Sequence, residues 1–158
     1  MKNKADELIE LIDTFQREFS DINDKIASVN LSEDKWSLKQ ILGHLIDSAS
    51  NNHQRFIRLQ LSDIVEFPDY NNEEWLKMQK HNIMLYNDIL LLFIHYNKLI
   101  ANVIANIDKR HLQNKWEIEW IDKSPCVTLE NLITHYNEHL KGHLDHFRER
   151  LNELKKTP

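Results

Sequence analysis

Hydrophobic positions recur at helical spacing along four long segments of this chain. In the first segment they step by four and three in strict alternation, the spacing of one narrow face of an α-helix. These positions are Leu8, Ile12, Phe15, Phe19, Ile22, Ile26 and Val29. This row of apolar positions, here called a seam, predicts a single helix over roughly residues 4–29. A second helix is predicted from Ser37 to about Leu61, because Ser37 and Gln40 have the spacing of a capping box.

Two further seams predict the remaining long helices. The third has its apolar positions at Leu85, Ile89, Leu92, Tyr96, Leu99, Val103 and Ile107. The fourth, for which Thr128 is the expected cap, has them at Leu129, Leu132, Ile133, Tyr136, Leu140, Leu144, Phe147 and Leu151. Amphipathic helices of this length cannot bury their seams alone. The pattern therefore predicts an all-α fold, a four-helix bundle, in a single domain over residues 1–158.

The links between these helices differ in length. Residues 30–36 form a short link, whereas residues 62–82 and 108–127 form long ones. Long links permit a crossover, so that two neighbouring helices run parallel. The first long link is expected to contain a short helix from Glu73 to about Lys80. The second contains Trp116 and Trp120, where at most a short piece of strand is expected.

Composition supports a helical protein and restricts the ligands and the cellular compartment that we expect for it. Gly occurs 2 times and Pro 3 times in 158 residues, too few for the turns of an all-β fold. The formal net charge is -5 without a basic stripe, which disfavours nucleic-acid binding. No signal peptide is recognisable, and the longest apolar run, Ile89 to Ile94, is too short to span a bilayer. With Cys126 as the one cysteine, we expect a cytoplasmic protein without membrane association.

Histidines concentrate on the predicted fourth helix, which carries His135, His139, His143 and His146. Each helical residue turns by about 100°, so His143 falls inside the apolar arc and His139 at its edge. His135 and His146 lie further toward solvent on the same wheel. A pair of histidines four residues apart can bind zinc, nickel or copper, although an isolated pair is common by chance.

The predicted second helix offers a third histidine. His44, Ser48, Asn51 and Arg55 form a polar stripe within about 60° on its wheel, beside the apolar arc. Such a stripe is costly next to a core unless its groups find partners, and a metal held by His44, His139 and His143 would supply them. The alternative is an ordinary solvated helix edge. Asp47 is either a carboxylate that orients a ligand imidazole or a surface residue.

Three histidine ligands leave coordination positions open on a tetrahedral or octahedral ion. This arrangement is typical of catalytic rather than structural sites. The open positions would hold water or an anionic ligand whose pKa the metal lowers. Zn²⁺ and Ni²⁺ are the metals that we expect. The remaining histidines have other roles: His53 is expected to be packed and hydrogen-bonded, and His81, His95 and His111 to be exposed.

In combination, these motifs resemble the DinB/YfiT-like superfamily of small helical metalloproteins. The similarity is carried by the segment from Trp36 to Ser48, by Asn51-Asn52-His53-Gln54-Arg55-Phe56, by Phe67-Pro68-x-Tyr70 with Trp75 and Gln79, and by His139-x3-His143. It covers nearly the whole chain. The resemblance implies an up-down-down-up four-helix bundle, a metal bound at positions that match His44, His139 and His143, and a homodimer. Some branches resemble thiol-dependent transferases and others are similar to metal-dependent hydrolases.

Two classes of function follow. In the first, the chain is a metalloenzyme that activates a nucleophile toward a small-molecule substrate. A low-molecular-weight thiol is the preferred nucleophile, giving an S-transferase, and water, giving a hydrolase, is the alternative. Asn51 and Arg55 would bind an anionic portion of substrate or cofactor. In the second class, the chain is a non-catalytic, metal-binding and dimerising bundle.

Overall fold

The computed structural model describes residues 1–117 and 126–156, and over these ranges it is predominantly helical. The long helices are α1 (Lys2–Phe19), α3 (Leu38–Arg58), α5 (Tyr86–Ala105) and α6 (Leu129–Lys156). Shorter helices are α2 (Asp24–Ala27) and α4 (Asn72–Gln79), with 3₁₀ turns η1 (His81–Ile83) and η2 (Lys109–His111). Three two-residue strands complete the list: β1 (Ile64–Val65), β2 (Lys115–Trp116) and β3 (Val127–Thr128).

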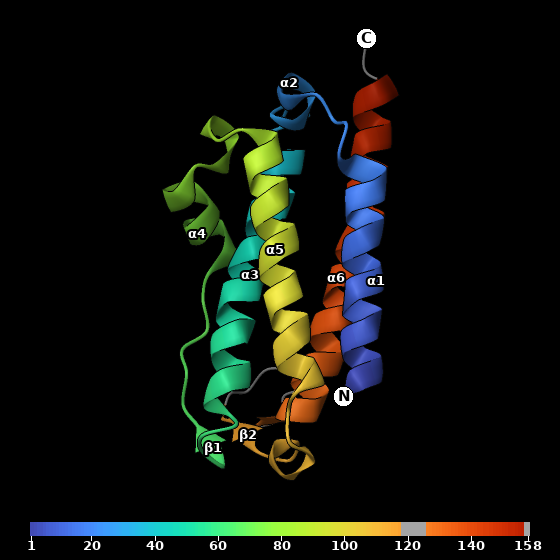
Figure 1. Ribbon diagram of the computed structural model, residues 1–158. Helices are drawn as coiled ribbons and strands as arrows, with labels where there is room; N and C mark the ends of the chain where they lie inside the picture. Colours follow the sequence, from blue (N-terminus) through green and yellow to red (C-terminus); the bar gives the residue numbers. More distant parts are fainter. Residues whose placement is uncertain (118–125, 157–158) are drawn as a thin grey trace.

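The four long helices form one bundle of the predicted up-down-down-up topology (Figure 1). In that view α1 and α6 run upward, whereas α3 and α5 run downward. Helix α1 packs against α5 and α6, and α3 packs against the same two helices from the other side. The core is a continuous set of apolar side chains from all four helices, such as Leu8, Leu42, Phe93 and Leu140. The prediction of an all-α four-helix bundle is therefore confirmed.

The two long links have different roles. The link after α3 returns along the whole bundle through α4, so α3 and α5 become parallel neighbours (Figure 1). The described parts of the link between α5 and α6, residues 106–117 and 126–128, lie at one end of the bundle. There β2 pairs in parallel with β1 and antiparallel with β3, which joins both links in a small sheet. Trp116 belongs to this sheet, whereas Trp120 lies outside the described residues.

The first predicted helix is wrong in its extent, because α1 ends at Phe19 instead of continuing to Val29. The Asn23 side chain accepts a hydrogen bond from the Lys25 amide and starts the separate helix α2. The apolar spacing continues through this break, but Ile26 and Val29 are 44% and 42% exposed. An ion pair between a buried lysine and a half-exposed aspartate connects α2 to α3: Lys39 is 1% exposed, and its Nζ lies 2.8 Å from the Asp24 carboxylate.

The seam predicted for the third helix is also wrong in part, because α5 buries a different face. Leu85, Leu92 and Leu99 of that seam are 62%, 48% and 47% exposed. The buried face instead carries Tyr86, Ile89, Leu90, Phe93, Ile94, Asn97, Ile100, Ala101 and Ile104. Asn97 fixes this face, because its Oδ1 accepts a hydrogen bond from the Tyr136 hydroxyl of α6 at 2.5 Å. Because α5 carries apolar side chains on more than one face, the spacing of its apolar residues does not identify which face is buried.

Helix α5 is also long and apolar enough to cross a membrane by length and composition alone. In this structure 44% of its most apolar stretch is buried in the bundle. Core helices of bundles meet the same criterion, so the feature distinguishes nothing by itself.

Candidate metal centre and adjoining cavity

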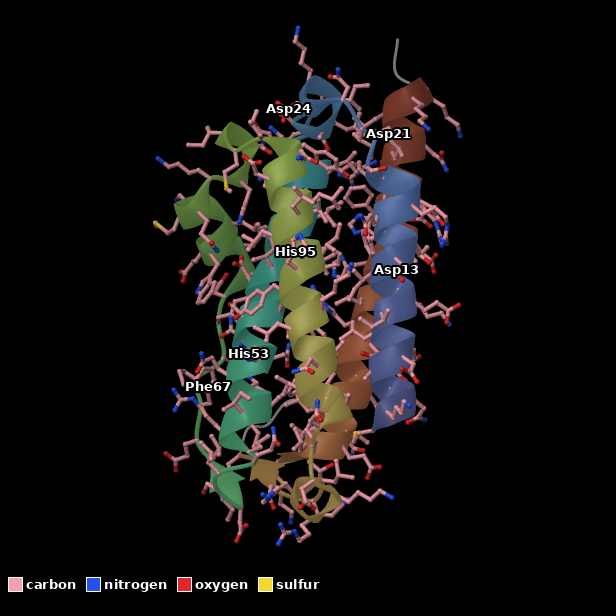
Figure 2. The ribbon with its side chains drawn as sticks, viewed as in Figure 1. Asp13, Asp21, Asp24, His53, Phe67 and His95 are labelled. Carbon is pink, nitrogen blue, oxygen red and sulfur yellow. The ribbon has the colours of Figure 1, made fainter. Side chains whose placement is uncertain are left out.

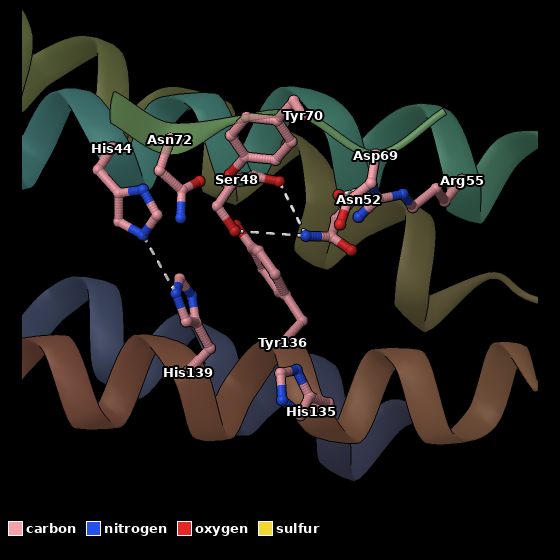
Figure 3. Close-up of a pocket in the computed structure, with 10 residues that line it drawn as sticks. All are labelled: His44, Ser48, Asn52, Arg55, Asp69, Tyr70, Asn72, His135, Tyr136 and His139. Atoms are coloured by element: carbon pink, nitrogen blue, oxygen red, sulfur yellow. Dashed lines mark hydrogen bonds and ion pairs between the residues drawn. The ribbon is translucent and has the colours of Figure 1, made fainter. Parts of the chain in front are cut away.

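Helices α3 and α6 bring His44, His139 and His143 together inside the bundle. One ring nitrogen from each of the three lies within 4.8 Å of the other two. The Nε2 atoms of His44 and His139 are 3.3 Å apart (Figure 3). The His143 ring centroid lies 4.9 Å from that of His44 and 4.5 Å from that of His139. The three imidazoles therefore converge on one point.

Local sequence fixes the helices that carry these rings. Ser37 begins α3 with the predicted capping box: its Oγ accepts from the Gln40 amide, and Gln40 Oε1 accepts from the Ser37 amide. His44 follows two turns later on the face that meets α6. The side chains of His139 and His143 lie one above the other, because residues four apart share a helix face.

The three imidazoles fit a divalent metal ion by their chemistry. Two nitrogens bound to one tetrahedral zinc ion at about 2.0–2.1 Å would lie roughly 3.4 Å apart, close to the observed 3.3 Å. Burial lowers the pKa of each histidine to about 4, so all three rings are neutral at pH 7 and offer lone pairs. Among the described residues, the buried Nδ1 atoms of these rings have no protein partner.

A cavity of about 260 Å³ opens beside two of these rings (Figure 3). It lies between α3, α6 and the segment that precedes α4. Its wall is formed by His44, Ser48, Asn52, Arg55, Asp69, Tyr70, Asn72, His135, Tyr136 and His139. This wall is mostly polar, and at this volume it suits a small ligand.

Arg55 occupies the end of the cavity farthest along α3 from His44. Its side chain is 3% exposed, and its Nη2 donates to Asp69 Oδ1 at 3.0 Å. The guanidinium also lies over the Trp116 ring, 3.8 Å from the ring centroid. The small sheet at the bundle end therefore positions the aromatic face on which Arg55 stacks.

The other residues singled out from the sequence lie around this centre. Asn51 is buried, donates to the Asp47 carbonyl at 2.9 Å, and is not part of the cavity wall given above. His135 is half-buried and lines the cavity. His146 is half-buried beside His143, with ring centroids 5.9 Å apart.

Asp47 fits neither of the two roles that the sequence suggested. It is 3% exposed, so it is not a surface residue. Its Oδ1 accepts from Gln79 Nε2 of α4 at 2.5 Å, whereas no described residue is bonded to Nδ1 of His44. Burial raises the pKa of this carboxyl to about 6.

The prediction that His81 is exposed is wrong, because the structure buries this residue. Its side chain is 4% exposed and packs onto α3 at Gly43. A position in a link suggested exposure, but the absence of a Cβ at Gly43 lets the ring approach the helix backbone. His95 is exposed as expected (Figure 2), and Nδ1 of His53 lies 3.4 Å from the Tyr96 hydroxyl.

Sequence reasoning missed part of the cavity wall. Asp69, Tyr70 and Asn72 come from the crossover link and reach the site only because that link runs along α3. Tyr136 was assigned to the apolar seam of the fourth helix, although its hydroxyl is bonded to Asn97. The motif Phe67-Pro68-x-Tyr70 was the only available signal for this segment.

Comparisons with known proteins agree with this architecture. The family model of the DinB superfamily matches residues 7–147. A Bacillus mycoides protein called a "putative metal-dependent hydrolase" is 20% identical over 155 residues, covering 90% of this chain and 88% of its own length. A Bacillus cereus protein of the same description is 19% identical over the same shares.

A solved structure is similar over nearly the whole fold. It is YfiT from Bacillus subtilis, described as a probable metal-dependent hydrolase with an unusual four-helix bundle topology. The TM-score is 0.83 at 17% sequence identity, and the match covers 97% of this chain and 86% of that chain. At this identity the likeness establishes the fold.

Proposed function

Since this chain belongs to the DinB superfamily, we propose that it is a metal-dependent hydrolase of small molecules. Its metal ligands would be His44, His139 and His143, and Zn²⁺ or Ni²⁺ would be the ion, because neutral imidazoles suit both. The observation that carries the proposal is the convergence of three ring nitrogens within 4.8 Å, beside a polar cavity.

The cavity supports a reaction at one side of the histidine cluster. His44 and His139 line it, so a ligand there can reach an ion held by the three rings. Such an ion would act as a Lewis acid and lower the pKa of bound water. In hydrolysis, the water oxygen bonds to the substrate carbonyl carbon, the bond to the leaving oxygen or nitrogen breaks, and a proton passes to the leaving group.

Residues of this chain would orient the substrate and supply hydrogen bonds. Burial raises the pKa of Tyr70 to about 12, so its phenol stays protonated and can donate to an oxygen that gains charge. Asn72 and Ser48 add polar groups near His44 (Figure 3). The names of the similar Bacillus proteins support hydrolysis over other chemistries.

Thiol transfer is the second candidate, favoured by the guanidinium of Arg55 at the far end of the same cavity. A low-molecular-weight thiol with an anionic part could bind there while its sulfur reaches the histidine cluster. The sulfur would then bond to an electrophilic carbon, which releases its leaving group, and the thiol proton would pass to solvent.

A chain that binds metal but catalyses neither reaction would be a structural metalloprotein.

The first test is metal binding by histidine variants. His44→Ala, His139→Ala and His143→Ala should each lose stoichiometric Zn²⁺ binding in calorimetry, because each removes one of three ligands. His146→Ala is the matched control and should keep it. Zinc should raise the free energy of unfolding of the parent by roughly 2.7 kcal/mol at a hundredfold excess over Kd. Retention of stoichiometric zinc by all three ligand variants would reject the site.

The second test separates the two reactions. The zinc-loaded protein is assayed on a nitrophenyl ester without thiol, and on a chlorinated aromatic electrophile with and without a small thiol. We expect ester hydrolysis that needs metal but no thiol, that rises with pH near 7, and that is lost in His139→Ala. Turnover only in the presence of thiol would favour the transferase, and no turnover with zinc bound would indicate the structural role.

A further inference from the structure

The far end of the cavity has the features of a built recognition site. Arg55 is held there by Asp69 on one side and by the Trp116 ring on the other. A planar guanidinium carries five N–H donors, and its orientation is fixed before any ligand arrives. Its Nε is buried and has no partner within residues 1–117 and 126–156. Arg55 therefore offers a donor that a ligand could satisfy.

Asn52 offers the complementary acceptor, one turn before Arg55 on the same cavity wall. Its Nδ2 donates to the Ser48 carbonyl at 2.9 Å and lies 3.3 Å from Ser48 Oγ, which fixes the amide plane (Figure 3). Its Oδ1 is buried and without a partner in the part of the chain that the structure describes. Unpaired buried polar atoms are costly, so a pair of opposite character in one cavity points to a ligand that completes both.

We propose that this end of the cavity binds a small substrate of the N-acyl amino acid type. Its carboxylate would accept hydrogen bonds from Arg55, and the adjacent N–H would donate to Asn52 Oδ1. The inference rests on the proposed function in one respect: the carbonyl that reacts would lie toward His44 and His139. The cavity of about 260 Å³ has room for such a molecule but not for a long peptide.

The charges around Arg55 favour a singly charged carboxylate over a phosphate. Asp69 lies 3.0 Å from the guanidinium and already compensates much of its charge. A doubly charged group would therefore meet net repulsion from the Asp69 carboxylate. Asp69 is 46% exposed and bonded to Nη2, so a singly charged carboxylate can bind at Nε, unpartnered in the described ranges, while Asp69 stays in place.

This arrangement makes Asp69 and Arg55 act in opposite directions on affinity. Asp69→Asn removes a competing carboxylate at an exposed position and should tighten binding of the acid. Arg55→Gln removes the cation and should abolish the preference for an acid over its neutral amide. Asp63→Asn changes an exposed carboxylate outside the cavity wall and is the matched control for net charge.

The test is calorimetric titration of the zinc-loaded protein with N-benzoylglycine and with its neutral amide. We expect the parent to bind the acid at least tenfold more tightly than the amide, Asp69→Asn to bind the acid several-fold more tightly than the parent, and Asp63→Asn to match the parent. Arg55→Gln should bind both ligands equally, with circular dichroism verifying that it is folded. If Arg55→Gln does not fold, the affinity of Asp69→Asn for the acid, compared with that of the parent, tests the inference.

Equal binding of acid and amide by the parent, or an unchanged affinity in Asp69→Asn, would overturn the inference. A preference that survives in Arg55→Gln but is lost in His139→Ala would also overturn it, because the carboxylate would then sit on the metal. These calorimetric measurements report ligand binding and do not require catalytic turnover. Metal-dependent ester hydrolysis without acid preference would reject only this inference, whereas acid preference without hydrolysis would reject only the proposed function.

Discussion

Asp47 is a buried carboxylate whose ionisation should oppose folding. Burial raises its pKa from 3.8 to about 6, despite the hydrogen bond from Gln79. Between these two values the unfolded chain releases its proton while the folded chain retains it. Stability associated with this group is therefore complete below pH 3.8, falls as the pH rises, and stays low above about pH 6. The penalty at neutral pH is at most about 3 kcal/mol, from about two pKa units.

Replacing Asp47 by asparagine should therefore stabilise the protein at pH 8 and not at pH 3.5. We expect the free energy of unfolding of Asp47→Asn to exceed that of the parent by about 1–3 kcal/mol at pH 8, measured by urea denaturation. The difference should vanish on acidification. Asp63→Asn, an exposed carboxylate, is the control and should change little at either pH. A gain that does not depend on pH would mean that charge is not the cause.

At the scale of single elements, the two glycines of the chain make opposite contributions to their helices. A Cβ at Gly43 of α3 would lie 2.3–2.5 Å from atoms of the buried His81 ring. A Cβ at Gly142 of α6 would meet nothing within 4 Å. Gly43 thus lets η1 approach α3, whereas Gly142 only lowers the helix propensity of α6.

Alanine substitutions at these glycines should shift stability in opposite directions. Gly43→Ala should lower the free energy of unfolding by about 1–3 kcal/mol, because His81 must be displaced. Gly142→Ala should raise it by up to about 1 kcal/mol, and each variant is the other's control. Thermal and urea unfolding measure both. Equal shifts of the same sign would show that the close contact between His81 and Gly43 does not govern packing of the link on α3.

For the whole molecule, an exposed apolar stripe gives the expected homodimer a surface: it consists of Leu85, which immediately precedes α5, and of Leu92 and Leu99 on α5. The residues recur every seven positions and are 47–62% exposed. Contiguous exposed apolar side chains commonly mark interaction sites. A seven-residue repeat packs well against the same repeat of a second copy about a two-fold axis. We therefore propose that two copies associate through this face.

Sedimentation should show a dimer for the parent and a monomer for the double variant Leu92→Glu, Leu99→Glu, because buried glutamates oppose association. Leu61→Glu is the matched control: Leu61 is 82% exposed and lies outside the stripe, so its variant should remain dimeric. A parent that is monomeric at 100 µM, or a double variant that still dimerises, would contradict the proposal.

Features that depend on local periodicity and local capping could be predicted from the amino-acid order. The helices α3 and α6 follow from their apolar spacing and from the Ser37 cap, and the class of fold follows from four such seams. His143 could be assigned to the apolar arc of its helix and His44 and His139 to the edges of theirs, because each position depends only on a helix turn of about 100° per residue. The structure brings these three rings together.

The buried face of α5 and the composition of the cavity wall required the three-dimensional structure. Apolar side chains lie on more than one face of α5, so its spacing alone did not identify the buried face; Asn97 on that face is bonded to Tyr136, 39 residues further along the chain. The cavity wall depends on where the crossover link lies, and this follows from the packing of α4 and η1 on α3. Contacts between distant segments set these features. Periodicity describes one helix at a time and therefore carries no information about them.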